Sequence, residues 1–414
     1  LYHHITFLDA SIDSYMPAGL YRDFYQWSLS EANPQHQAWS QLIGLPQFVK
    51  MTATLLEGLV SDEQWYELVQ YSLAINTYLL FETISDNLGI GIIYPENAHL
   101  RQHVTTFNNA MLARLENRKL AWQLAMGKLA TQMEVSAFAQ SLSPHKHQNI
   151  AQVYAVHHPD VNLRDLEYGL FPSLVANIES CYILYNQCAL LQGGALVQAG
   201  LRARYEGMNK LVNSPDMSLD ERIHASTDAI LVIPTLGYYI SVLAECFYQL
   251  PDFGVVLASG QLDVALREAA LIVRFLNDLG ALTRLPMLDI DLLLATLKRE
   301  ARDDETILEL ICRADVGAHI TRLQKDAVHG ELNLALHGIG DQVVCDASLK
   351  ALKDRLFYLQ AVYATSYTNM EKALRHIEQH EGFGFVRILL ERFVGFHERM
   401  YNISYREEPG EYAV

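Results

Sequence analysis

Apolar residues recur at helical spacing along almost the whole chain, and this pattern restricts the fold more than any other feature. One continuous stripe runs at steps of four and three through Leu262, Leu266, Ala269, Val273, Leu276 and Gly280. Such spacing places side chains on one face of an α-helix, whereas a strand requires alternation. Only 12 prolines and 23 glycines interrupt 414 residues. The sequence therefore predicts an all-α protein.

The pattern also predicts how the helices are organised. Long helices are expected over residues 64–86, 118–142, 163–191 and 348–380, and breaks are expected where Pro, Gly and small polar residues cluster. No long Gly/Ser-rich or Pro-rich linker, internal repeat or low-complexity tract separates them. We therefore expect a single α-helical domain over residues 1–414.

Charge and cysteine usage restrict the partners and the compartment. The chain carries 31 Lys and Arg against 48 Asp and Glu, a formal net charge of -17. This balance disfavours nucleic acid and anionic membrane surfaces. The five cysteines are odd in number and form no CxxC pair, which is typical of reduced thiols in a cytoplasmic protein. We expect no nucleic-acid partner and a cytoplasmic location.

Two uncharged segments are candidates for membrane spans. Residues 180–201 contain too many amide side chains for lipid. Residues 229–244 are more apolar but fall short of the roughly 18 to 20 residues that a span needs. Pro234 and Gly237 interrupt this second segment. We predict a buried helix broken at 234–237, and no transmembrane segment or signal peptide.

Two polar sites stand out on otherwise apolar helices. Glu82 and Asp86 lie four residues apart at the end of the helix predicted over 64–86, so both carboxylates share a face. Asn277 and Asp278 interrupt the stripe described above, where burial costs free energy unless a partner satisfies them. Hard cations prefer such oxygen ligands. Two simpler alternatives stay open: a solvated helix end at 82–86, and a local Arg274–Asp278 ion pair.

In these features the chain resembles a class I terpene synthase. That family carries a DDxxD motif on one helix and an Asn-Asp-x-x-Ser/Thr-x-x-x-Glu motif on a later one. "ETISD" (residues 82–86) matches the outer acids of the first motif, and "NDLGALTRL" (residues 277–285) matches the opening of the second. The resemblance implies one large helical bundle with a central apolar pocket. It further implies a lyase or cyclase that converts a hydrophobic isoprenoid, such as a prenyl diphosphate, through a carbocation.

The resemblance also implies roles for individual residues. Mg2+ would be held by Glu82, Asp86 and Asn277. The catalytic set would be Asp86, Asn277, Asp278, Thr235 and Gly237, the last two at the helix break, where a backbone carbonyl would face the cation. The substrate would contact Tyr78, Phe81, Tyr238, Phe275, Arg399 and Tyr401. Tyr405 and Arg406 are alternatives to the last pair, and the aromatic residues could equally form an ordinary core.

Several positions depart from the family pattern. Thr83 replaces the second aspartate, and Ala281 and Leu285 replace the later Ser/Thr and Glu. Leu231 or a neighbouring aliphatic residue stands where an arginine is expected. The distance between the motifs also implies an insertion around 141–165. Either other residues complete the metal cluster, or the substrate lacks a diphosphate. In the second case Asp86, Asp278 or a pocket histidine would protonate it.

Two other functions are weighed against the cyclase. A helical di-iron oxygenase, with iron as the cofactor, would use Glu67, Glu96, His99, Glu179, Glu221 and His224. Its two Glu-x-x-His pairs fall at predicted helix beginnings, whereas di-iron ligands come from facing helix interiors. The third function is a non-catalytic prenyl-binding protein of the same fold. A hydrophobic small molecule is the expected partner, and a homodimer stays open.

Overall fold

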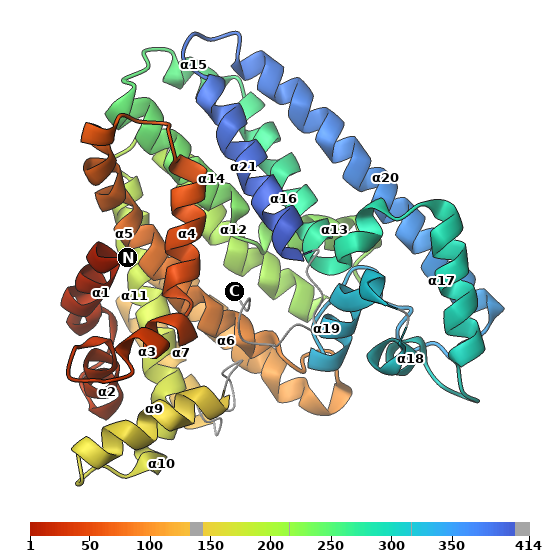
Figure 1. The fold of residues 1–414 in the computed structure, drawn as a ribbon, viewed down its shortest axis with the longest axis horizontal. Helices are drawn as coiled ribbons and strands as arrows, with labels where there is room; N and C mark the ends of the chain where they lie inside the picture. The colour runs from red at the N-terminus through yellow and green to blue at the C-terminus, as the bar shows by residue number, and fades with distance from the viewer. Residues whose placement is uncertain (133–143, 215, 316, 402–414) are drawn as a thin grey trace. The chain divides into compact units, whose positions relative to one another are not determined.

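Helices make up most of the described chain in the structure, a computed structural model (Figure 1). The structure describes residues 1–132, 144–214, 216–315 and 317–401. Within these ranges no strand occurs, and the only β-type pairing is an isolated bridge between Thr306 and Val343. The predicted all-α class is confirmed. The terpene synthase type of bundle stays a prediction.

The chain divides into two compact units, which are described separately below. Within the described ranges, unit 1 covers Leu1–Gly89 and His99–Tyr205, and unit 2 covers Ile90–Ala98 and the residues from Glu206 onward. The boundary falls inside helix α12 (Gly194–Asn213). Such a division does not test whether the units fold separately, so the single domain over 1–414 stays a prediction.

Unit 1 consists of short helices around two long ones. Its elements are α1 (Tyr2–Tyr15), α2 (Leu20–Leu29), α3 (His36–Leu42), α4 (Leu45–Leu56), α5 (Asp62–Asp86), η1 (Asn87–Gly89), nearly all of α6 (Ala98–Leu115), α7 (Lys119–Gln132), α9 (Pro144–His157), α10 (Leu163–Leu166), η3 (Glu167–Gly169), α11 (Leu170–Cys188) and the first part of α12.

Unit 2 contains the remaining helices. Its elements are η2 (Pro95–Asn97), the end of α12, α13 (Leu219–Asp228), α14 (Val232–Val242), the π-helical turn η4 (Leu243–Phe247), α15 (Phe253–Ala258), α16 (Gln261–Leu279), η5 (Gly280–Arg284), α17 (Met287–Glu300), α18 (Ile307–Arg313), η6 (Ala318–Ile320), α19 (Thr321–His329), α20 (Asp346–Ile377) and α21 (Gly384–Tyr401).

Helix α5 forms the centre of unit 1. It begins with a capping box in which Ser61 and Gln64 bond each other's backbone N–H groups. Its residues 72–82 are all buried, and α5 packs against α11, α1 and α4. A helix buried on every side needs an internal partner for each polar side chain it carries. Glu82 lies in this buried part.

Helix α16 forms the centre of unit 2, as α5 does in unit 1. The predicted stripe is confirmed, because every member from Leu262 to Gly280 is buried. The helix packs along α20, with α21, α14 and α13 against its other sides (Figure 1). It ends at Gly280, whose φ of 53° suits glycine. A Cβ there would stand 2.7 Å from Cγ of Arg322 and 3.0 Å from the carbonyl oxygen of Tyr401.

The predicted helices match the structure with local differences. Residues 64–86 and 348–380 correspond to α5 and α20. The helix expected over 163–191 is interrupted by the 3-10 turn η3, which separates α10 from α11. The helix expected over 118–142 is described as far as Gln132, and its remainder lies outside the described residues. Of the insertion expected around 141–165, residues 141–143 also lie outside them, while 144–157 form α9; its status as an insertion stays a prediction.

The predicted helix break at residues 234–237 is wrong. Helix α14 begins at Val232 and continues to Val242. Pro234 therefore occupies the first turn, where backbone N–H groups have no helical partner and proline is tolerated. The chain instead bends before α14, where α13 and α14 meet at 43°.

No single helix in the described part of the chain is both long and apolar enough to cross a membrane. One bent pair, Leu219–Asp228 with Val232–Phe247, reaches that length and composition together.

Candidate functional site

Glu82 forms a buried ion pair rather than facing an open space. Both Nε and Nη2 of Arg204, on α12, donate to its Oε1 at 2.8 and 2.6 Å. The two side chains are only 7% and 8% exposed. The predicted ligand of Mg2+ thus already has a cation as its partner within unit 1.

The second carboxylate oxygen of Glu82 is equally well bonded. Its Oε2 accepts from Nδ2 of Asn177 at 2.9 Å, from the hydroxyl of Ser85 at 2.6 Å and, at 3.4 Å, from Tyr205. The Tyr205 hydroxyl also lies 2.9 Å from that of Tyr78. Glu82 is therefore the acceptor at the centre of a buried polar network that joins α5, α11 and α12.

The electrostatics of Arg204 agree with this arrangement. Burial alone would lower the pKa of its guanidinium, but the charges of Glu82 and Asp86 outweigh burial and raise the pKa well above its usual value. Arg204 is consequently a fixed cation. Removing its carboxylate partners would leave an uncompensated buried charge.

Asp86 has a different environment from Glu82, although both bond the same arginine. Its Oδ1 lies 2.9 Å from Nη2 of Arg204, while its side chain is 72% exposed. The solvated helix end weighed as an alternative therefore describes Asp86 but not Glu82. Of the two acids in the first motif, only Asp86 presents its carboxylate to solvent.

Asp278 is held by partners of its own unit. It forms an ion pair with Arg274, one helical turn earlier, and its Oδ2 accepts from the backbone N–H of Leu334 at 3.0 Å. Its side chain is 1% exposed. The local ion pair weighed as an alternative for Asp278 is the arrangement found. A catalytic role for Asp278 stays a prediction.

Arg322, which no pattern in the sequence indicated, contacts both Asn277 and Tyr401. Arg322, on α19, donates from Nε to the carbonyl oxygen of Asn277 at 2.7 Å and from Nη2 to its side-chain oxygen. The same guanidinium lies over the ring of Tyr401, 4.8 Å from its centroid. Gly280 permits this approach, since any side chain there would collide with Arg322. This explains the glycine that follows the Asn-Asp pair.

No pattern in the sequence indicated Arg204 or Arg322. Arg204 lies 122 residues after Glu82, and Arg322 lies 45 residues after Asn277. Neither stands in a motif with the residue it bonds. Partners so far apart are decided by the packing of helices, for which a single sequence offers no direct signal.

Thr235 and Gly237 lie inside a continuous helix. Both are buried in α14, and the carbonyl oxygen of Gly237 accepts from the hydroxyl of Ser241 at 2.7 Å. The break that would have exposed a carbonyl is not present at these residues. The catalytic role predicted for Thr235 and Gly237 depended on that break, so the continuous helix does not support it.

The predicted substrate contacts differ in exposure. Four of the aromatic side chains, Tyr78, Phe81, Tyr238 and Phe275, are buried. The fifth, Tyr401, is half-buried. Burial is shared by a packed core and an enclosed pocket wall, so their role stays a prediction. Arg399 is exposed on α21. The alternatives Tyr405 and Arg406 lie outside the described residues.

The residues of the di-iron alternative have other partners or are exposed. Glu179 accepts two hydrogen bonds from Arg114, at 3.0 and 2.9 Å. Glu221 completes the N-terminal capping box of α13 with Ser218, and Nδ1 of His224 lies 2.7 Å from a backbone oxygen. Glu96 lies in the turn η2 before α6, and both Glu96 and Glu67 are exposed. Both Glu-x-x-His pairs thus stand at helix beginnings, as expected.

The predicted Mg2+ ligands do not fit a metal cluster as they stand. Glu82 and Asp86 bond Arg204 in unit 1, and Asn277 bonds Arg322 in unit 2. Among the described residues, no three His, Cys, Asp or Glu side chains are grouped so as to hold an ion. Mg2+ therefore stays a prediction that these contacts do not support.

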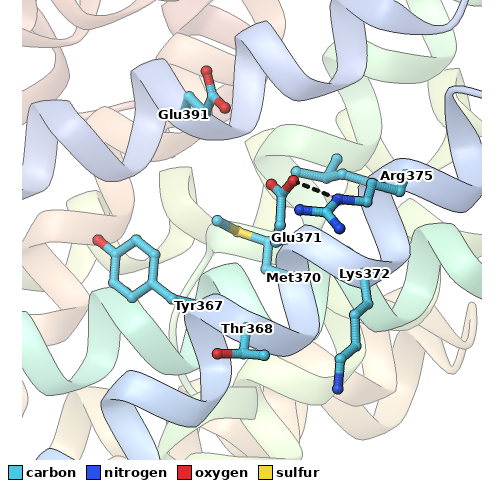
Figure 2. Close-up of a pocket in the computed structure, with 8 residues that line it drawn as sticks. Tyr367, Thr368, Met370, Glu371, Lys372, Arg375 and Glu391 are labelled. Atoms are coloured by element: carbon cyan, nitrogen blue, oxygen red, sulfur yellow. Dashed lines mark hydrogen bonds and ion pairs between the residues drawn. The ribbon is translucent and has the colours of Figure 1, made fainter.

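A groove of about 490 Å³ lies between α20 and α21 in unit 2 (Figure 2). Its lining residues are Tyr367, Thr368, Met370, Glu371, Lys372, Leu374, Arg375 and Glu391. Four of these carry charge, and Glu371 pairs with Arg375 at 2.9 Å and with Arg387. An apolar chain would desolvate these charges, so the groove does not suit a prenyl group.

Comparison with known proteins adds no assignment: no family model matches the chain, and no curated protein or solved structure proved similar to it.

Proposed function

We propose that the protein binds a hydrophobic isoprenoid on a helical scaffold of the terpene synthase type, without metal-assisted loss of a diphosphate. The order of the acidic and Asn-Asp segments supports the isoprenoid class of ligand. The contacts around these segments support binding rather than turnover.

One observation carries this proposal: side-chain oxygens of Glu82 and Asn277, at predicted metal-ligand positions, already accept hydrogen bonds from arginines. A metal ion at Glu82 would have to displace Arg204, which is 8% exposed. Breaking a buried ion pair in this way costs about 3–5 kcal/mol. This free-energy cost would oppose the binding of a metal ion at Glu82.

A Mg2+-dependent cyclase is the second candidate, and the exposure of Asp86 favours it. This carboxylate is 72% exposed and could accept an ion without disturbing the buried network around Glu82. The two candidates predict different effects of Mg2+, so one set of measurements separates them.

The test uses the full chain and prenyl diphosphates of C10 to C25, each compared with its prenyl alcohol and with a straight-chain alcohol of equal carbon number. Calorimetry measures binding in Mg2+ and in EDTA, and extracted products are analysed in parallel. We expect the diphosphate and the prenyl alcohol to bind with similar affinity in both buffers, to bind more tightly than the straight-chain alcohol, and to be recovered unchanged.

Two results would contradict the proposal. A product that needs Mg2+ and disappears in Asp86→Asn would establish the cyclase instead. Absence of binding for every diphosphate and every prenyl alcohol would remove the isoprenoid class altogether.

A further inference from the structure

Helix α17 carries apolar side chains on two opposite faces. Its inward face packs against α20 within unit 2 (Figure 1). The buried side chains of this face are those of Ile290, Leu293, Leu294 and Leu297. This inward face alone accounts for the packing of α17 in its unit.

The opposite face of α17 is apolar and exposed. We call Leu288, Leu292 and Ala295 the outer stripe, because steps of four and three place them on one side of the helix. Leu288 is 78% exposed and Leu292 is 67% exposed, and Met287 before them is 64% exposed. A helix that is apolar on opposite faces is typically covered on both, and steps of four and three are typical of a seam between helices. The outer stripe therefore indicates a second helical neighbour.

Charged side chains are ordered along α17. Asp289 and Asp291 lie in its first half. Lys298 and Arg299 lie in its last turn and outnumber the single acid there, Glu300. This order suits the helix macrodipole, which accounts for the charges but not for the exposed leucines. The surface beside the outer stripe is thus acidic at one end and basic at the other.

Two of these charges form ion pairs with α20 at the surface. Asp291 pairs with Lys353, and Lys298 pairs with Asp346. The four side chains are between 32% and 85% exposed. Ion pairs so exposed contribute little to stability, so Asp291 and Lys298 can turn to a further partner at small cost.

We propose that the outer stripe is the contact between two copies of this chain, with α17 antiparallel to α17 of the second copy about a two-fold axis. Leu292 then faces Ala295 of the second copy, and Asp291 lies beside Lys298 of the second copy, each contact occurring twice. A parallel arrangement would place like charges beside each other. An acidic start and a basic end are complementary to their own reversed copy, which favours a second copy as the occupant of the stripe.

The contact is expected to be weak and does not depend on the isoprenoid proposal, because no ligand takes part in it. One helix of 14 residues offers less than the roughly 800 Å² per partner of a standard stable interface. The net charge of -17 on each chain also opposes association. Salt at about 0.15 M limits this repulsion to a range of about 8 Å and screens charges in direct contact less. The dimer population should therefore rise with protein concentration.

The first test is sedimentation equilibrium of the full chain in this salt, from micromolar to near-millimolar concentration. Leu292→Glu places a charge in the middle of the outer stripe and should raise the dissociation constant of the dimer about 10-fold or more. Leu190→Glu is the matched control, because Leu190 is 88% exposed and follows α11, outside α17. The control should change the dissociation constant by no more than about twofold. Circular dichroism should stay unchanged in both variants, since both positions are exposed.

A charge-exchange experiment tests the antiparallel arrangement. Asp291→Lys and Lys298→Asp each bring like charges together in their own dimers, so each variant alone should dimerise more weakly than the wild type. An equimolar mixture of the two variants restores opposite charges at both contacts and should dimerise about as tightly as the wild type. A role of these residues in folding alone would give no recovery on mixing.

Three results would overturn the proposal. They are a wild type that stays monomeric over the whole concentration range, equal weakening by Leu292→Glu and Leu190→Glu, and a mixture of the charge variants that does not recover. A monomeric wild type that binds phosphatidylcholine vesicles, with binding lost in Leu292→Glu, would assign the outer stripe to a lipid surface instead.

Discussion

Glu82 and Asp86 provide a direct test of whether the first acidic motif is structural. Both bond Arg204, but the Glu82 side chain is 7% exposed and that of Asp86 is 72% exposed. The perturbation is Glu82→Ala compared with Asp86→Ala. Glu82→Gln, which keeps the shape without the charge, separates packing from electrostatics.

The expected magnitudes follow from these environments. Glu82→Ala removes the buried partner of Arg204 and takes one acceptor each from the donors of Asn177, Ser85 and Tyr205. Breaking such a buried pair costs about 3–5 kcal/mol in the free energy of unfolding. Asp86→Ala removes a solvated partner and should cost about 1 kcal/mol or less.

Urea unfolding followed by tryptophan fluorescence suits this comparison. All four tryptophans, Trp27, Trp39, Trp65 and Trp122, lie in unit 1, so their emission reports the unit that contains Glu82. The midpoint and slope of the transition in each variant give the change in stability. Circular dichroism in parallel shows whether unit 2 unfolds in the same transition.

A metal ligand and a structural acid make opposite predictions for the metal-free protein. If Glu82 served only to hold an ion, its removal would relieve local negative charge and leave the metal-free protein at least as stable as before. Equal losses for the two alanine variants, or no loss in Glu82→Ala, would refute the reasoning.

Two further predictions concern unit 2. Leu266→Ala, at a fully buried position of the α16 stripe, should lower the free energy of unfolding by about 2–5 kcal/mol. Val264→Ala, at a position 39% exposed on the same helix, should lower it by about 0.5 kcal/mol. Urea unfolding followed by circular dichroism measures both losses, and similar losses in the two variants would contradict the assigned buried face. Burial alone would raise the pKa of Glu331, but its hydrogen bond from His329 and the charge of Lys325 lower it from 4.5 to about 2. The ionised carboxylate therefore stabilises the fold above about pH 4.5, and this contribution is lost as the pH falls toward 2. The stability difference between wild type and Glu331→Gln should accordingly be full at pH 7 and shrink below pH 4.5, and a difference that stays constant down to pH 3 would count against this ion pair.

Features that depend on local spacing could be predicted from the sequence. The stripe from Leu262 to Gly280 predicted α16 and its buried face, because a helical period repeats within the helix itself. Helical spacing predicted α5 and α20 for the same reason. The Arg274–Asp278 pair was foreseeable as well, since both residues lie on one helix at a separation of four.

Features that depend on which helices meet could not be predicted in this way. Spacing alone made Glu82 and Asp86 equivalent, yet burial of α5 against α11 separates them into a network acid and a solvated one. The helix break expected at Pro234 failed because proline is tolerated in a first turn, and its position relative to the helix start was not known.

The sequence by itself determined the helical class, the faces that become buried and the pairs that form within one helix, since these follow from residue spacing along the chain. Only the tertiary structure decided that Arg204 and Arg322 are the partners of Glu82 and Asn277. The physical reason is that a buried polar side chain takes its partner from whichever helix packs against it, and that neighbour is set by the packing of the whole unit.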